Sequence, residues 1–390
     1  MKMRAPQNPQ APLLIYLLVS LAILFPALLL AGCAGLSNTC SPNCIGENLS
    51  QRNLADYNFN AADLSKATFI GTNLADADLS GANLSGADFT DANLNSTDLS
   101  YANLTGATLK NARIVGADLT GADLNSADMT GVVITRLNLE KTEMKAAVLN
   151  DASLIGVDMQ GVDLSGSQLI KADLRGADLT NANLSGVDLT KANLSGAILN
   201  GASLTGATLV EATLSGAKLN MARLTGADLT GATLDGTEMR VANLDGALLL
   251  TTNLAGASLD SAILTRAMLA GANFNGAVLT GADLSGAIFS VILEENGVEY
   301  LVSSSFGGTS MARANLANTY MAGVHIDGAN IKWADLSSAI IVDEVTMNGE
   351  NIVIYADITG VKTNEKTIWP ETFQTENNEP AGDDQPPDQP

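Results

Sequence analysis

One residue in every five is apolar over most of this chain, and that spacing restricts the possible folds more than any other feature. From Leu49 to Phe289 every fifth position is apolar without a break, which makes 49 consecutive positions, and Leu occupies 38 of them. Coiled coils and helical repeats have periods near 3.5 or 3.6 residues. A period of five therefore excludes both and predicts a solenoid of very short repeats.

The residues around each apolar centre repeat as well. Ala stands two residues before 35 of the 49 centres, and Asp or Asn stands between them at 27, as in Ala77-Asp78-Leu79. Residues two apart on a strand face the same side, so Ala and Leu should point inward and Asp or Asn outward. The small polar residues and Gly that follow each centre should form a corner before the next strand.

This consensus of Ala-Asp/Asn-Leu-Ser/Thr-Gly closely resembles that of the pentapeptide-repeat family. The resemblance implies an all-β fold, a right-handed quadrilateral parallel β-helix with four repeats in each coil. Right-handed crossovers agree with the general preference of parallel strands. At 20 residues and about 4.8 Å per coil, residues 47–289 would form about 12 coils and a rod about 60 Å long.

The repeats stop after Phe289 and return near Met311 in a register moved by two residues. We therefore expect residues 290–310 to be an insertion and residues 311–343 to be a resumed block of repeats. Two short apolar segments flank Asn296-Gly297 inside the insertion. An Asn-Gly pair in that setting predicts a β-hairpin at 290–303.

The C-terminal residues are expected to close the rod. Residues 344–373 should cap the last coil, because the terminal strands of a solenoid are otherwise open edges. Within them, the segment from Lys366 to Phe373 resembles a tail that family members dock on the rod. Residues 374–390 are acidic and rich in Pro, a composition typical of disorder.

Residues 1–32 have the layout of a secretory signal peptide, since Lys2 and Arg4 precede an apolar run. The run ends in Leu30-Ala31-Gly32-Cys33, which resembles the lipobox of bacterial lipoproteins, in which the Cys receives a diacylglyceryl group. The resemblance implies a protein anchored to a membrane through lipid on Cys33, in the cell envelope and outside the cytoplasm. An uncleaved anchor and a soluble secreted form are the alternatives.

Two further cysteines, Cys40 and Cys44, lie in the expected tether at residues 33–46. In an oxidising compartment a Cys40–Cys44 disulfide is favoured. Free or otherwise paired thiols are the alternative. A metal site is disfavoured because two Cys with no nearby His give only two ligands.

The net charge of −22 excludes direct nucleic-acid binding by neutralisation of phosphates. It leaves basic proteins or cations as partners of an acidic surface. The single His, His325, directly precedes the centre Ile326 and is expected to face solvent. No motif of a hydrolase, a phosphate-binding loop or a dinucleotide site occurs, so the sequence predicts no catalytic residue, no cofactor and no metal site.

If the coil has four sides, outward residues 20 positions apart stack in columns, one on each side of the rod. Two of these columns are unusual in composition. One column holds an acidic ladder: Asp78, Asp98, Asp118, Asp158 and Asp178. The alternative interpretation is that outward Asp and Asn simply follow the repeat consensus. The other column holds an apolar surface patch that needs a cover: Leu248, Met268 and Ile288. We expect the hairpin at 290–303 to lie near that face, with a partner protein as the alternative cover.

Together these patterns predict a scaffold or protein-interaction module, an acidic rod tethered through Cys33 with an unknown protein partner. The rod is also similar to the quinolone-resistance members of the family, which mimic DNA and protect gyrase. The signal peptide argues against that function, because gyrase is cytoplasmic. An envelope carrier or enzyme with a site at the insertion is the third interpretation.

Overall fold

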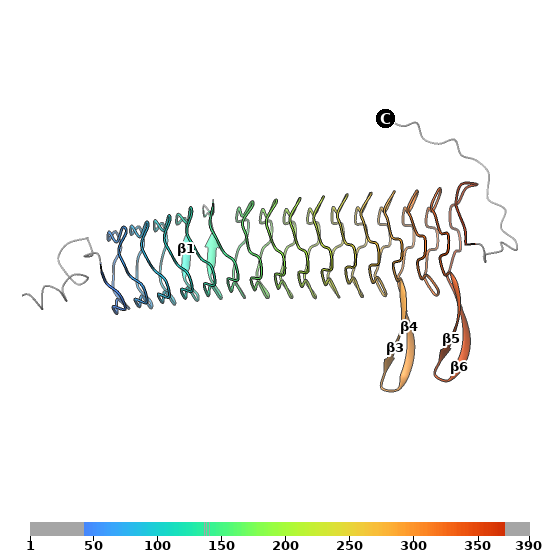
Figure 1. Cartoon of the computed structure of the whole chain (residues 1–390), viewed down its shortest axis with the longest axis horizontal. Helices are drawn as coiled ribbons and strands as arrows, with labels where there is room; N and C mark the ends of the chain where they lie inside the picture. The colour runs from blue at the N-terminus through green and yellow to red at the C-terminus, as the bar shows by residue number, and fades with distance from the viewer. Residues whose placement is uncertain (1–42, 136, 138, 140, 371–390) are drawn as a thin grey trace, which may run out of the picture.

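Twenty residues make one coil of the rod. The computed structural model describes residues 43–135, 137, 139 and 141–370, and Figure 1 shows them as one long solenoid. Parallel β-bridges join each outward residue to the one 20 positions later, as in Asn58 to Asp78 and Asp78 to Asp98. Four repeats therefore fill each coil, and the predicted right-handed quadrilateral β-helix is confirmed. The three-residue strands β1 (Arg113–Val115) and β2 (Val133–Thr135) are one such parallel pair.

Each repeat turns its corner with the help of its own outward residue. The second residue after the centre has a left-handed backbone, with φ of 64° at Gly81 and 58° at Gln51. The outward Asp or Asn accepts a hydrogen bond from the backbone N–H two residues later, as Asp178 Oδ1 does from Thr180 at 3.0 Å. Asp and Asn are preferred there because their short side chains reach this N–H.

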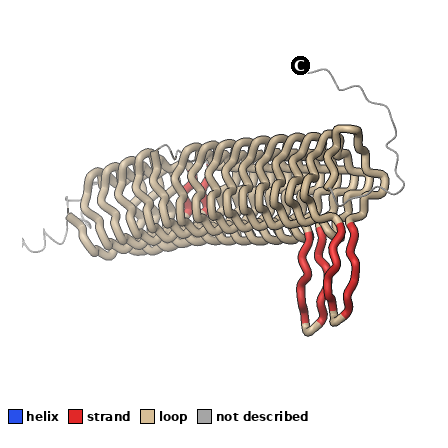
Figure 2. The backbone as a smooth tube through the Cα atoms, turned by 45° about the vertical axis from the view of Figure 1, so that its right-hand side comes forward, coloured by secondary structure: helices blue, strands red, loops and turns tan. Residues whose placement is uncertain are grey.

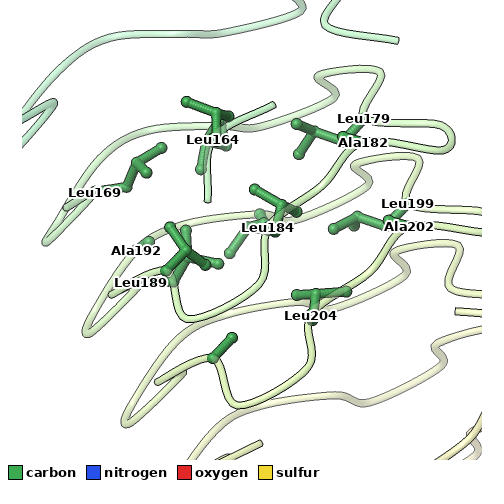
Figure 3. Packing of buried hydrophobic residues seen from close by; sticks show 14 of the residues in the cluster. Leu164, Leu169, Leu179, Ala182, Leu184, Leu189, Ala192, Leu199, Ala202 and Leu204 are labelled. Atoms are coloured by element: carbon green, nitrogen blue, oxygen red, sulfur yellow. The ribbon is translucent and has the colours of Figure 1, made fainter. Parts of the chain in front are cut away.

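The apolar centres fill the inside of the coil, and all 49 of them are buried. Figure 3 shows leucines of successive coils, such as Leu179 and Leu199, stacked in the interior beside small Ala residues. Aromatic centres occur near both ends of the rod. The rings of Phe69 and Phe89 stack with centroids 4.7 Å apart. That distance matches the spacing of neighbouring strands, so each ring packs on the ring of the next coil.

Some inward Ala positions hold Thr or Ser, and their hydroxyls are paired. Thr72 Oγ1 donates to the carbonyl of Leu49 at 2.9 Å, and Thr97 Oγ1 donates to the carbonyl of Leu74 at 2.8 Å. Each bond reaches back to the preceding coil. An unpaired buried hydroxyl would cost free energy, and among the described residues no buried side-chain polar atom lacks a partner.

Two antiparallel hairpins project from the rod near its C-terminal end, as Figures 1 and 2 show. The first joins β3 (Ser290–Glu295) to β4 (Val298–Ser303) around Asn296-Gly297, at the predicted place. The second joins β5 (Val342–Met347) to β6 (Glu350–Tyr355). It was not predicted.

The first hairpin is a shorter insertion than the sequence suggested. Ser304 N–H donates to the carbonyl of Phe289 at 2.9 Å, so the chain rejoins the same coil at Ser304. Phe306 is already a buried centre. The repeats therefore resume at 304 and not at 311. Ser304 at an inward position, where Ala is usual, concealed this repeat.

The predicted cap at 344–373 also needs correction. Residues 342–355 leave the rod as the second hairpin, and Ala356 N–H returns to the carbonyl of Ile341 at 2.9 Å. Residues 356–370 then complete the last coil through bridges of Asp357, Lys362 and Ile368 to the coil before. The β-branched residues of 342–355 pair with one another around a turn, so they do not cover the end of the rod.

The first hairpin is seated between the corners of two neighbouring coils. A Cβ added at Gly271 would lie 2.9 Å from Cγ1 of Val302, and one added at Gly323 would collide with Leu301. Gly271 belongs to the preceding coil and Gly323 to the following one. At the base of the hairpin, the face that carries Val302 therefore points toward the preceding coil, and the face that carries Leu301 points toward the following coil.

We predict that inward and outward residues respond very differently to substitution. Leu179→Asp buries an unpaired charge and should lower the free energy of unfolding by about 4 kcal/mol or more. Asp178→Asn keeps the Oδ1 acceptor of the corner and should change it by less than about 0.5 kcal/mol. Thermal melts followed by circular dichroism measure both changes. Equal losses would contradict the assignment of faces.

We also predict that Gly323→Ala loosens the first hairpin. The substitution places a methyl group against Leu301, in addition to the cost of about 1 to 2 kcal/mol of a left-handed backbone. Gly256→Ala is the matched control, because its φ is 67° and its Cβ would meet no atom within 4 Å. Amide hydrogen exchange in β3 and β4 should be faster only in Gly323→Ala. Unchanged protection there would show that the hairpin does not depend on this seat.

Candidate interaction surfaces

The proposed lipidation site, Cys33, lies outside the described residues, as does Cys40. Cys44 is buried and disulfide-bonded. In the part of the chain that the structure describes, no helix is both long and apolar enough to cross a bilayer. The apolar run before Cys33 also lies outside that part.

The five Asp of the acidic ladder lie in one column of the rod. Bridges join Asp78 to Asp98 and Asp98 to Asp118, and a further bridge joins Asp158 to Asp178. Position 138, between the two groups, lies outside the described residues. After Asp178 the column continues with Ile198, Lys218 and Glu238, so its Asp residues lie in the N-terminal half and one further acidic residue follows them.

Each ladder carboxylate is also a structural group. Its Oδ1 accepts the corner N–H two residues on, at 2.9 to 3.1 Å, in all five cases. The second oxygen of Asp78 accepts from Asn58 Nδ2 at 3.2 Å, and that of Asp178 accepts from Gln160 Nε2 at 3.0 Å. The position of the ladder thus follows from corner formation, whatever else the surface binds.

In other columns of the rod, basic side chains form ion pairs with some of the outward carboxylates. Lys110 Nζ lies 3.0 Å from Asp128 Oδ2 of the next coil, and Lys145 Nζ lies 3.4 Å from Asp163 Oδ2. Burial acts to raise the pKa of Asp128. Hydrogen bonds from Thr130 and Lys110 outweigh it, and the pKa falls below its usual value. These carboxylates stay ionised well below neutral pH.

His325 is placed on the surface, with 60% of its side chain exposed, and its Nδ1 lies 3.8 Å from Asp357 Oδ2. The pKa of Asp357 is lowered chiefly by the hydrogen bond from the backbone N–H of Thr359, with a smaller contribution from His325. Over the described ranges, no cluster of three or more His, Cys, Asp or Glu side chains is placed to hold a metal ion.

The predicted apolar patch is part of a longer column. Bridges align Leu248, Met268 and Ile288, and the same column continues through Tyr320 and Ile340. We call these five residues the apolar strip. Ile288 is 37% exposed and Ile340 is 46% exposed. The sequence did not show the extension because the hairpin makes the step from Ile288 to Tyr320 32 residues long.

The first hairpin does not lie flat over this strip. Its first strand begins two residues after Ile288, and the hairpin projects away from the rod, as Figure 2 shows. The second hairpin makes one polar contact with the strip, because Tyr320 Oη donates to Asp343 Oδ2 at 2.8 Å. Burial, with help from Asp343, raises the pKa of Tyr320 to about 12. The expectation that the first hairpin covers the patch is therefore wrong, and a partner protein as the cover stays a prediction.

The second hairpin is the surface feature that sequence reasoning missed. Its signal was present, because Asn348-Gly349 is the same turn pair that identified the first hairpin. The flanking segments are rich in β-branched residues, with Val345 paired to Ile352 across the strands. Asn348 also contacts the first hairpin, where Glu299 N–H donates to Asn348 Oδ1 at 2.8 Å.

The stacked carboxylates predict a salt dependence of stability. Like charges about 5 to 10 Å apart repel at low ionic strength and are screened as salt is added. Raising NaCl from 10 to 150 mM should increase the melting temperature by roughly 2 °C, equivalent to about 1 kcal/mol. The variant D98N/D118N/D158N keeps its corner acceptors and should lose most of that increase. A melting temperature that falls steadily with salt would argue against mutual repulsion.

Solved structures of repeat proteins resemble this chain. One is HetL, a pentapeptide repeat protein involved in heterocyst differentiation regulation from the cyanobacterium Nostoc sp. strain PCC 7120. HetL is 34% identical to this chain, the match covers 63% of this chain and 94% of HetL, and the TM-score is 0.24. Rfr23 from the cyanobacterium Cyanothece 51142 is 27% identical over 30% of this chain and 91% of its own, with a TM-score of 0.24. QnrB1, a plasmid-mediated fluoroquinolone resistance protein, is 17% identical over 64% and 91%, with a TM-score of 0.24. The comparison with curated proteins finds no match.

The family profile "Pentapeptide repeats (8 copies)" matches overlapping segments throughout residues 48–290 and again at 301–341, which together exceed half of the chain. Those residues are the ones that form the coils described above. With its period of five and its four-sided coil, the chain belongs to the pentapeptide-repeat family.

Proposed function

We propose that this protein is a lipid-anchored interaction scaffold of the cell envelope, exposed outside the cytoplasm. One observation carries the proposal. The described part of the rod begins at residue 43, ten residues after Cys33 in the sequence, whereas both hairpins leave the rod near its other end (Figure 1). The rod separates an anchor from a projecting apolar head by about 60 Å, from the usual spacing of strands.

The composition of the rod supports a non-catalytic role. Its inward side chains stack in the core, and its outward Asp and Asn cap corners. The two hairpins contain neither His, Cys, Lys nor Arg, so they lack the usual nucleophile and base pairs of an enzyme. A stiff rod with a projecting head holds a partner at a set distance from the membrane.

The anchor is tested by Cys33→Ala, with Cys40→Ala as the control. Lipid attachment needs the Cys33 thiol, so labelled palmitate should be incorporated into the unmodified chain and into Cys40→Ala, and incorporation should be lost in Cys33→Ala. The variant should move from the membrane fraction to the soluble fraction, because it lacks the acyl chains whose buried methylenes each contribute about 0.8 kcal/mol to membrane binding. Its melting temperature should be unchanged, because residue 33 precedes the first described coil. An unlabelled parent protein, found in the cytoplasm and bound to gyrase, would overturn the proposal in favour of the DNA-mimic function.

A further inference from the structure

Exposed apolar side chains gather on the two hairpins. The described residues include 17 large apolar residues with exposed side chains, and six belong to these two short ribbons: Leu293, Val298, Tyr300, Val342, Val353 and Tyr355. Ile288 and Ile340 of the apolar strip are also exposed, and each stands two residues before a hairpin. Single exposed apolar residues are ordinary, but a contiguous group on one projecting element indicates an interaction site.

Each hairpin carries these residues on one face. Residues opposite each other on paired strands point to the same side, as do alternate residues along a strand. On the first hairpin the face includes Leu293 opposite Tyr300, and Glu295 opposite Val298. On the second it includes Val342 opposite Tyr355, and Glu344 opposite Val353. Each hairpin thus presents one Tyr, two aliphatic side chains and one Glu on this face. The two faces look away from each other along the rod, because the opposite faces, which carry Leu301 and Asp343, lie against Gly323 and Tyr320 of the coil between the hairpins.

Contacts at the base and the tip hold the hairpins in place. Asn348 N–H donates to Glu299 Oε2 at 2.6 Å, and Asn348 Nδ2 donates to the Glu299 carbonyl at 2.9 Å. These bonds, with that of Glu299 N–H to Asn348 Oδ1, join the second turn to β4. An isolated two-stranded hairpin is marginally stable in water. Fixing both ribbons beforehand lowers the entropy lost when a partner binds.

The charge of the hairpins is of one sign. Their residues include six carboxylates and no Lys or Arg: Glu294, Glu295, Glu299, Asp343, Glu344 and Glu350. Glu295 and Glu344 share a face with the exposed apolar side chains, and the other four carboxylates lie on the opposite faces of the same ribbons. A partner that buries the apolar groups must bring basic groups close to these carboxylates, since like charges at an interface cost several kcal/mol.

We infer that the hairpin pair is the docking head for a partner protein whose contact surface combines apolar side chains with Lys or Arg. The inference rests on the interaction-scaffold function proposed above and names the surface and the chemistry of its partner. Other occupants carry the wrong charge. A second copy would bring six more carboxylates to the contact, the tail at 374–390 has five acidic residues and no basic one, and anionic lipid would be repelled.

The partner is identified by photo-crosslinking in cells. The full-length chain carries p-benzoyl-phenylalanine at Tyr300, at Tyr355, or at Tyr101 as the control. Tyr101 is 67% exposed and lies on the rod, so it reports contacts that any exposed aromatic position makes. We expect adducts with the same protein from Tyr300 and Tyr355 and none from Tyr101, with Lys or Arg in the crosslinked peptide.

A binding assay with the identified, purified partner then tests the chemistry. The variant E294Q/E295Q/E344Q removes three charges from the hairpins, and D98N/D118N/D158N removes three from the ladder, so the two have the same net charge. The hairpin variant should weaken binding at least tenfold and the ladder variant by less than twofold. L293S/Y300S, which removes apolar contacts, should also weaken it at least tenfold. Circular dichroism melts verify that each variant folds.

Each other outcome contradicts the inference at a recognisable point. Adducts from Tyr101 as strong as those from the hairpins would show that the partner does not prefer the hairpins. Equal losses of binding affinity in the two charge variants would show the same. Either result would leave an interaction scaffold without a docking head on the hairpins. Adducts between copies of the chain would make the head a dimer contact. A crosslinked peptide that lacks basic residues would overturn the stated chemistry. No adduct from any of the three positions would overturn both the docking head and the scaffold function.

Discussion

Backbone pairing between residues 20 positions apart is the interaction on which the rest of this structure depends. Each outward residue forms parallel bridges to the coils on both sides, as Asp78 does to Asn58 and Asp98. The pairing brings identical repeat positions into register at the spacing of neighbouring strands. Leu therefore stacks on Leu, Phe69 stacks on Phe89, and Leu and Ala fill a core of small cross-section although only 4% of the residues are aromatic.

The same register explains why much of the outward surface is acidic. Asp and Asn recur there because an acceptor at that position stabilises the corner that follows, as Asp178 does for Thr180. Stacking then turns a local preference into a continuous acidic column. A surface of this kind can arise from the repeat without selection for a ligand. The hairpins differ, because their exposed Tyr and aliphatic residues serve neither the corners nor the core.

Most of the rod could be predicted from the sequence because every repeat gives the same local signal. Where the signal was interrupted, the prediction lost accuracy. Ser304 in place of the usual Ala concealed the return of the chain to the rod, and the 32-residue step from Ile288 concealed Tyr320 as the next residue of the apolar strip. The hairpin at 290–303 followed from Asn296-Gly297. Its direction did not, because the direction depends on how Val302 and Leu301 pack beside Gly271 and Gly323, and those contacts join different coils.

The four-sided coil makes the rod a ruler that sets distance and direction separately. A duplicated coil of 20 residues would move the hairpins about 4.8 Å farther from the first coil and leave the direction in which they project unchanged. A single duplicated repeat of five residues would instead shift everything after it by one side, so that the hairpins would leave the rod from a neighbouring corner. Changes in the length of the rod would thus preserve the side from which the hairpins project only when they come in multiples of four repeats.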